Sequence, residues 1–138
     1  MLTVSEIMTR NPEHIQATES VQEAINRLLE LDVRHLPVTD ENGELVGVLS
    51  DRDLREFRQP IEMQFENQTA SGERGQSPVS DLMQGDVISA NPEDDVTELI
   101  DLMIDQKIGA IPIVDPIEGN LVGIVSYVDI LRAARDRW

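Results

Sequence analysis

The sequence predicts an α/β (α+β) fold made of two pseudo-symmetric β-α-β-β-α units. The segment Val33 to Asp40 recurs as Ile108 to Asp115, and Leu45 to Asp53 recurs as Leu121 to Asp129. One such unit is too small to bury an adequate core by itself, so duplicated units of this size usually pack as a pair. We therefore divide the chain into a first repeat at 1–56, a linker at 57–77 and a second repeat at 78–134.

The composition fits a protein with a sizeable hydrophobic core. The chain has 138 residues, of which 40% are hydrophobic, and no cysteine. No stretch approaches the roughly 20 apolar residues of a membrane span, and no basic segment followed by an apolar run opens the chain. We expect a soluble, cytoplasmic protein with no disulfides, no cysteine chemistry and no membrane partner.

The charge balance is strongly acidic. Asp and Glu number 27 against 11 Lys and Arg, and the net charge is -16. Binding to nucleic acid depends on neutralising phosphates with basic side chains, so a nucleic-acid partner is not expected. Such a surface is typical of a salt-adapted organism, and an ordinary acidic cytosolic protein is the alternative.

Each repeat is predicted to contain an amphipathic helix with a capped start. Ser20 and Glu23 have the spacing of a capping box, and a helix over 21–31 follows with its apolar residues on one face. Asp95 and Glu98 repeat this signal before a second helix.

Two short strands are predicted after each helix, at 36–39 and 45–49 and again at 111–114 and 121–125. The first two flank an Asn-Gly pair that suits a tight hairpin turn. A further helix is expected to begin at Ser50 and at Ser126, and a weak first strand lies near Ile15 and near Val87. Residues 57–77 have little periodicity and are typical of a surface linker.

The motif Gly-h-h-Ser-x-x-Asp, where h is apolar, occurs at the end of the last strand in both repeats. It places Ser50 with Asp53, and Ser126 with Asp129, at a strand-to-helix junction. A helix start suits a phosphate, and a carboxylate can accept hydrogen bonds from two ribose hydroxyls. The same Ser-x-x-Asp spacing is also a plain capping arrangement that needs no ligand. Both interpretations stay open, and they are compatible.

The chain resembles a tandem pair of cystathionine beta-synthase (CBS) domains, a Bateman module. The resemblance rests on the order of elements, on the strands His35 to Val38 and Ala110 to Ile113, and on the doubled Gly-h-h-Ser-x-x-Asp motif. The opening Val4 to Thr9 and its echo Val79 to Gln84 also fit the family.

The resemblance implies a regulatory module that binds an adenosine-containing ligand, such as AMP, ADP, ATP or S-adenosylmethionine, in a cleft between the repeats. In one site it implies Ser50, Asp53 and Val48, with Val87, Ile88, Gly109 and Ala110 from the second repeat. In the other it implies Ser126, Asp129 and Ile124, with His14, Ile15, Arg34 and His35 from the first repeat.

The two implied sites differ in charge. Arg34 and His35 stand where the family often places phosphate-binding cations, whereas Gly109 and Ala110 carry no charge, so we expect the Ser126/Asp129 site to prefer a phosphorylated ligand. Alternatively, Arg34 forms a surface ion pair and His35 packs at the interface between the repeats. For His14 a structural role is favoured over ligand contact.

No catalytic residues and no metal-ligand cluster are evident, so an enzyme is not expected, and we expect no bound cofactor. Methionines are interpreted as core filler. The family also suggests a homodimer, and an unknown effector protein would supply the output. The alternatives are a ligand-independent oligomerisation or scaffold module, and a protein that binds a divalent cation.

Overall fold

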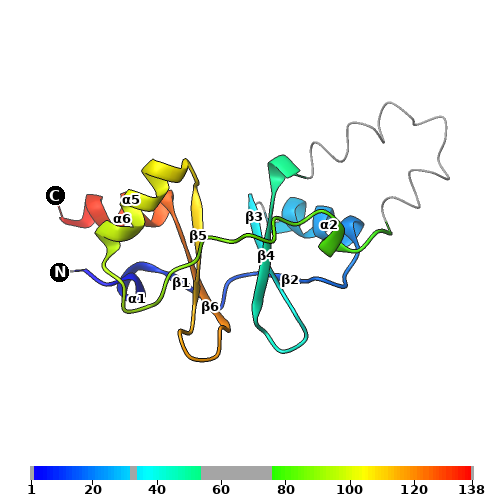
Figure 1. Ribbon diagram of the computed structural model, residues 1–138. Coiled ribbons are helices and arrows are strands. Elements are labelled where there is room, and N and C mark those ends of the chain that lie inside the picture. Colours follow the sequence, from blue (N-terminus) through cyan, green and yellow to red (C-terminus); the bar gives the residue numbers. More distant parts are fainter. Residues whose placement is uncertain (1, 32–33, 54–75, 138) are drawn as a thin grey trace. The chain divides into compact units, whose positions relative to one another are not determined.

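The structure, a computed structural model, describes residues 2–31, 34–53 and 76–137. These residues form two compact units, each built on a three-stranded sheet (Figure 1). Unit 1 comprises Met1–Pro12, Gly43–Leu45 and Ile88–Trp138, and unit 2 comprises Glu13–Asn42 and Val46–Val87. The predicted mixed α/β class is confirmed.

Unit 1 has a sheet in the order β1-β6-β5, in which β6 is central. Strands β5 and β6 are antiparallel, and Ala110 lies opposite Ser126. The predicted strands at 111–114 and 121–125 are confirmed, each with one further residue. The elements of this unit are α1 (Val4–Ile7), β1 (Thr9–Arg10), α5 (Val96–Gln106), β5 (Ala110–Val114), β6 (Leu121–Ser126) and α6 (Tyr127–Arg137).

Unit 2 has a sheet in the order β2-β3-β4, with β2 parallel to β3. A helix begins at Asp51, directly after β4, as predicted from the Ser50 motif. The helix predicted at 21–31 and the strands of the first repeat are also confirmed. The elements are β2 (Ile15–Gln16), α2 (Val21–Leu31), β3 (His35–Thr39), β4 (Leu45–Ser50) and the 3-10 helix η1 (Val79–Asp81).

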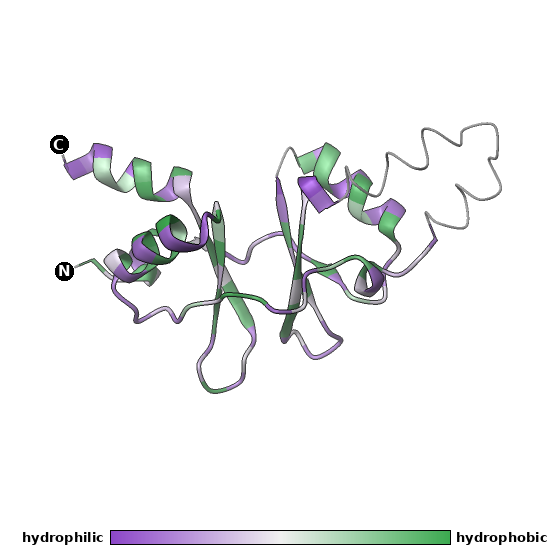
Figure 2. Ribbon diagram, turned by 45° about the horizontal axis from the view of Figure 1, so that its top comes forward, coloured by the Kyte–Doolittle hydropathy of each residue, from purple (hydrophilic) through white to green (hydrophobic). Residues whose placement is uncertain are grey.

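Each unit has its own apolar core between one face of its sheet and its helices. In α2, Val21, Ala24 and Leu28 are buried at helical spacing, and they pack with the strand residues Leu36 and Leu49. Unit 1 repeats this arrangement with a cluster of equivalent residues. Its buried members are Val4, Ala90, Leu99, Ile111, Ile113 and Val125. In Figure 2 the strands are largely apolar, whereas the helices contain both apolar and polar residues.

The compact units cut across the sequence repeats, because the two repeats exchange their opening segments. Residues 1–12 belong to unit 1, where Thr9 pairs with Ile124 of β6, and the matching Gln84 pairs with Val48 of β4 in unit 2. In Figure 1 the blue α1 and β1 accordingly lie with the orange and red elements β6 and α6. The predicted boundaries 1–56 and 78–134 thus describe the duplication, and residues 57–75 of the predicted linker lie outside the described residues.

Equivalent backbone hydrogen bonds fix both exchanged segments. In unit 1 the Val4 amide donates to the Asp94 carbonyl (2.9 Å), and in unit 2 the Val79 amide donates to the Glu19 carbonyl (2.8 Å). Val4 and Val79 are both fully buried. The duplication seen in the sequence is therefore also a duplication of backbone contacts.

The glycine that opens the Gly-h-h-Ser-x-x-Asp motif provides room for the exchanged segment. A Cβ on Gly47 would lie 2.5 Å from the sulfur of Met83 and 3.0 Å from the carbonyl oxygen of Gln84. Met83 and its counterpart Met8 pack against the two cores, which confirms the prediction of core filler for these two methionines. The motif glycine is needed for this close approach of backbone and side chain.

The helix starts largely follow the predicted capping. The Glu23 amide donates to the Ser20 hydroxyl (3.1 Å), as the capping-box spacing predicts. Asp95 does cap α5, but its carboxylate accepts from the Thr97 amide (2.9 Å). Among the described residues no helix has the length and apolar character to cross a bilayer.

Candidate functional site

Ser126 and Asp129 form a reciprocal capping box at the start of α6. The Ser126 amide donates to Asp129 Oδ2 (2.9 Å), and the Asp129 amide donates to Ser126 Oγ (3.3 Å). The second carboxylate oxygen, Oδ1, lies 3.6 Å from the Arg132 guanidinium, and only 10% of the Asp129 side chain is exposed. The carboxylate is thus held in one orientation at the helix start.

Ser50 and Asp53 repeat this geometry in unit 2. The Ser50 amide donates to Asp53 Oδ2 (3.0 Å), and the Asp53 amide donates to Ser50 Oγ (3.1 Å). Here Oδ1 accepts from the side-chain amide of Gln84 (3.3 Å), which comes from the exchanged segment. Both motifs therefore act as helix caps, and both keep further acceptor capacity, since a carboxylate offers about four lone-pair sites.

The start of each hairpin lies beside the Ser-Asp pair of the same repeat. The Asp51 amide donates to the Arg34 carbonyl (2.8 Å), and in the matching position the Tyr127 amide donates to the Gly109 carbonyl (3.0 Å). The family resemblance groups Arg34 and His35 with the Ser126/Asp129 pair, and that grouping stays a prediction. Within unit 2 these two residues lie beside Asp51 and Asp53.

Gly109 and Ala110 likewise lie beside the other pair, with Ala110 opposite Ser126 in the β5-β6 ladder. The predicted grouping of these two residues with Ser50 and Asp53 also stays a prediction. Their place beside Ser126 follows from hairpin geometry, because the first residue of one strand adjoins the last residue of its hydrogen-bonded neighbour.

His35 is half-buried at the start of β3. Burial lowers the pKa of its imidazole below the ordinary value of 6.5, and the positive charge of Arg34 lowers it further. The carboxylates of Asp53 and Asp51 act in the opposite direction. The net effect keeps the imidazole neutral to a lower pH than usual.

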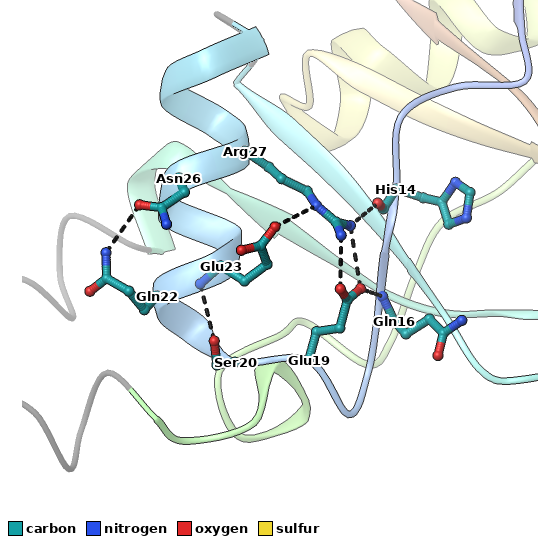
Figure 3. Close-up of polar contacts among 8 residues, drawn as sticks. All are labelled: His14, Gln16, Glu19, Ser20, Gln22, Glu23, Asn26 and Arg27. Carbon is teal, nitrogen blue, oxygen red and sulfur yellow. Dashed lines mark hydrogen bonds and ion pairs between the residues drawn. The ribbon is translucent and has the colours of Figure 1, made fainter.

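The segment of His14 and Ile15 is anchored by Arg27 of α2 (Figure 3). Arg27 donates to the His14 carbonyl (2.8 Å) and binds both carboxylate oxygens of Glu19, at 2.8 and 3.3 Å. It also donates to Glu23 (3.2 Å). The His14 imidazole points away from this network in Figure 3, so the anchored group is the backbone.

The apolar residues predicted for the sites differ in how deeply they are buried. Ile15 is fully buried in the core of unit 2, so only its backbone is available to a ligand. Val48 and Ile124 are half-buried at matching strand positions, opposite Gln84 and Thr9. Val87 and Ile88 are both half-buried. Along the chain, Val87 is the last residue of unit 2, and Ile88 begins the final segment of unit 1.

Two residues that contact the candidate carboxylates were not predicted. Arg132 follows Asp129 by three residues on a predicted helix, so the i, i+3 spacing could have indicated it. Gln84 is 31 residues from Asp53, and nothing in the sequence indicates which repeat its segment joins. Within residues 2–31, 34–53 and 76–137, no group of three or more His, Cys, Asp or Glu side chains is placed to hold a metal ion.

Both repeats match a known domain family. The family model of the CBS domain matches residues 4–59 and 79–136, that is, both repeats. The chain belongs to the CBS domain family. The CBS domain-containing protein YhcV of Bacillus subtilis is 34% identical over 130 residues, which cover 94% of this chain and 84% of YhcV. The resemblance inferred from the motifs is thereby confirmed.

Solved structures of CBS domain pairs share the fold. CBSX2, crystallised in complex with AMP, has a TM-score of 0.83 and 30% identity over 99% of this chain and 98% of that chain. The CBS domain pair of protein MJ0100, in complex with 5'-methylthioadenosine and S-adenosyl-L-methionine, has a TM-score of 0.80 and 25% identity, covering 100% and 99%.

Enzymes also match, but only over a CBS portion of their length. An inosine-5'-monophosphate dehydrogenase of Methanocaldococcus jannaschii is 30% identical over 142 residues, which cover 99% of this chain and 24% of the enzyme.

Proposed function

We propose that the protein is a regulatory CBS module that binds an adenosine-containing ligand, namely AMP, ADP, ATP or S-adenosylmethionine, and signals to a partner protein by a conformational change. The observation that carries this proposal is the doubled Ser-Asp pair. Asp53 and Asp129 are each held at a helix start beside a hydroxyl, and relatives with this fold were solved with AMP or with S-adenosylmethionine.

The local chemistry supports a ribose and phosphate ligand. A fixed carboxylate can accept from two vicinal hydroxyls, and the helix start offers partial positive charge to a phosphate. With Arg34 and His35 as its predicted companions, the Ser126/Asp129 pair is expected to have the stronger preference for phosphate. Near Asp129, the guanidinium of Arg132 is a further cation.

A regulatory role is favoured over catalysis. The chain matches the enzymes over about a fifth to a quarter of their length, 24% in one dehydrogenase and 20% in a homoserine O-acetyltransferase. Three quarters or more of each enzyme therefore lies outside the match and can hold the catalytic residues. For the protein studied, the output would come from a partner.

The test is thermal unfolding with AMP, ATP, S-adenosylmethionine and Mg²⁺, each added separately. A ligand at 100 times its dissociation constant adds about 2.7 kcal/mol to the free energy of unfolding. Asp53→Asn and Asp129→Asn keep an acceptor for the capping amide but remove the charge, so each should weaken the response to AMP. Ser20→Ala removes a cap with no proposed ligand role and should leave that response intact.

A second candidate function is a ligand-independent oligomerisation or scaffold module. The specific observation in its favour is that both Ser-Asp pairs form complete capping boxes, so capping alone accounts for the Ser-x-x-Asp spacing. If no adenosyl compound raises the melting temperature, this candidate replaces the first. A response to Mg²⁺ alone would support the cation-binding alternative instead.

We further propose a homodimer in which α6 contributes to the interface. Tyr127, Val128 and Leu131 lie within one helical turn of each other and are 50, 45 and 62% exposed. An apolar helix face of this kind suits burial against a second copy of the chain. The effector protein would then read the shape of the assembled dimer.

A further inference from the structure

The carboxylate of Asp53 is oriented from two sides by groups of different origin. Oδ2 accepts from the backbone amide of Ser50 (3.0 Å), which belongs to the same capping box. Oδ1 accepts from the Gln84 side-chain amide (3.3 Å), which is 31 residues distant in the sequence. Fixing both oxygens sets the plane of the carboxylate.

Gln84 is itself held firmly by its backbone. Its amide donates to the Val48 carbonyl (3.0 Å), and its carbonyl accepts from the Val48 amide (3.1 Å). Met83, the preceding residue, fills the space over Gly47. The exchanged segment thus carries a side-chain donor to Asp53 from a backbone position that two hydrogen bonds define.

The other repeat is built differently at the matching position. Thr9 takes the place of Gln84 and pairs with Ile124, the counterpart of Val48. The carboxylate of Asp129 lies beside Arg132 of its own helix instead. The link from an exchanged segment to the carboxylate is therefore a property of the Asp53 pair, and it makes the two pairs unequal.

A carboxylate held in this way is preorganised for a vicinal diol. Each oxygen has two acceptor sites, so Ser50 and Gln84 leave one on each oxygen. A group that is already oriented loses less freedom when it binds, which favours affinity. We propose that Gln84 is a positioning residue that sets Asp53 to accept both ribose hydroxyls, so that this pair distinguishes ribose from deoxyribose.

This inference rests on the proposed function, and its test compares AMP with 2'-deoxy-AMP by isothermal titration calorimetry. In an Asp129→Asn background, Asp53 is the one unmodified aspartate of the two Ser-Asp pairs. There, Gln84→Thr, which installs the residue of the other repeat, should weaken AMP binding on the order of fivefold, the loss of about one hydrogen bond. The affinity for 2'-deoxy-AMP should change much less.

Two controls separate this role from a general loss of structure. Gln84→Glu keeps the size of the side chain but removes the donor, so it should reduce the preference for AMP at least as much as Gln84→Thr. Thr9→Gln, the reciprocal change, should leave that preference unchanged in the same background. In the wild type, the side-chain NH2 resonances of Gln84 should shift when AMP is added.

The outcomes are distinct. If Gln84→Thr weakens AMP and 2'-deoxy-AMP equally, or weakens neither, the positioning role is overturned while ligand binding stands. If the wild type binds no adenosyl compound, the proposed function fails and this inference fails with it.

Discussion

The side chain of Met8 lies so close to Gly123 that a Cβ on this glycine would be 2.6 Å from the methionine sulfur and 3.1 Å from the Thr9 carbonyl oxygen. Met83 lies over Gly47 in the same way, with a corresponding distance of 2.5 Å. Each exchanged segment is thus fitted against a glycine of the sheet that it completes.

Gly123→Ala should destabilise the protein by about 1–3 kcal/mol, because the added methyl group overpacks this contact. Urea unfolding measures the change. Gly85→Ala is the matched control, since a Cβ there has no neighbour within 4 Å, and it should change stability by no more than about 0.5 kcal/mol. Equal effects of the two substitutions would contradict the close packing.

Arg27→Ala should lower the free energy of unfolding by about 1–3 kcal/mol, because charge-assisted hydrogen bonds to Glu19 and the His14 carbonyl are lost. The Arg27 and Glu19 side chains are only about a third exposed, at 30 and 31%. In contrast, Arg135 pairs with Asp136 in an ion pair that is 73 and 66% exposed. Arg135→Ala should therefore cost at most about 0.5 kcal/mol in the same urea experiment.

Asp129→Ala should cost about 1 kcal/mol even without ligand, because it removes half of the capping box of α6. Asp129→Asn keeps an acceptor for the Ser126 amide and should cost much less. Chemical unfolding of both variants in ligand-free buffer tests this. If the Asp129→Ala and Asp129→Asn variants are equally stable, the cap does not contribute to stability.

Protonation of His35 should destabilise the folded protein. Its pKa is lowered by burial and by Arg34, so the unfolded chain binds the proton more readily than the folded protein does. The stability present above pH 6.5 should be lost as the pH falls from that value through the lowered folded pKa. His35→Gln should reduce this loss of stability, measured as the free energy of unfolding against pH. If the wild type and His35→Gln lose equal stability over this pH range, His35 is not the titrating group.

Leu131→Glu should shift the protein toward the monomer if α6 lies in a homodimer interface, because it buries a charge against an apolar partner. Light scattering coupled to size-exclusion chromatography gives the mass directly. Ile117→Glu is the control, since Ile117 is 91% exposed in the β5-β6 turn and has no proposed partner. An unchanged mass for Leu131→Glu would exclude this face of α6 from the interface.

Most local structure could be predicted from patterns within each repeat. Helix α2 has the predicted bounds Val21–Leu31, because apolar periodicity and the Ser20 cap both act locally. The placement of Arg34 beside Asp51 could also have been derived, since hairpin geometry alone brings them together. The grouping of Arg34 and His35 with the Ser126/Asp129 pair follows family resemblance across the repeats, and it stays a prediction.

The exchange of opening segments could not be predicted in this way. Met8 and Met83 are preceded by similar residues, and both sheets offer a glycine at the matching place, Gly123 or Gly47. Either segment therefore fits either sheet as far as the pattern shows. The choice depends on how the connecting chain closes, which is a non-local property. For the same reason the contact between Gln84 and Asp53 appears only in three dimensions.

The exchanged segments also impose an order on biosynthesis. The sheet of the first repeat lacks its last partner until Gln84 leaves the ribosome, after all three strands of that sheet have been made. Thr9 is made before every other strand of its own sheet, and its partner Ile124 emerges only after β5. Both halves therefore reach their native state late, and a nascent chain stalled at the boundary between the repeats would expose two incomplete edges.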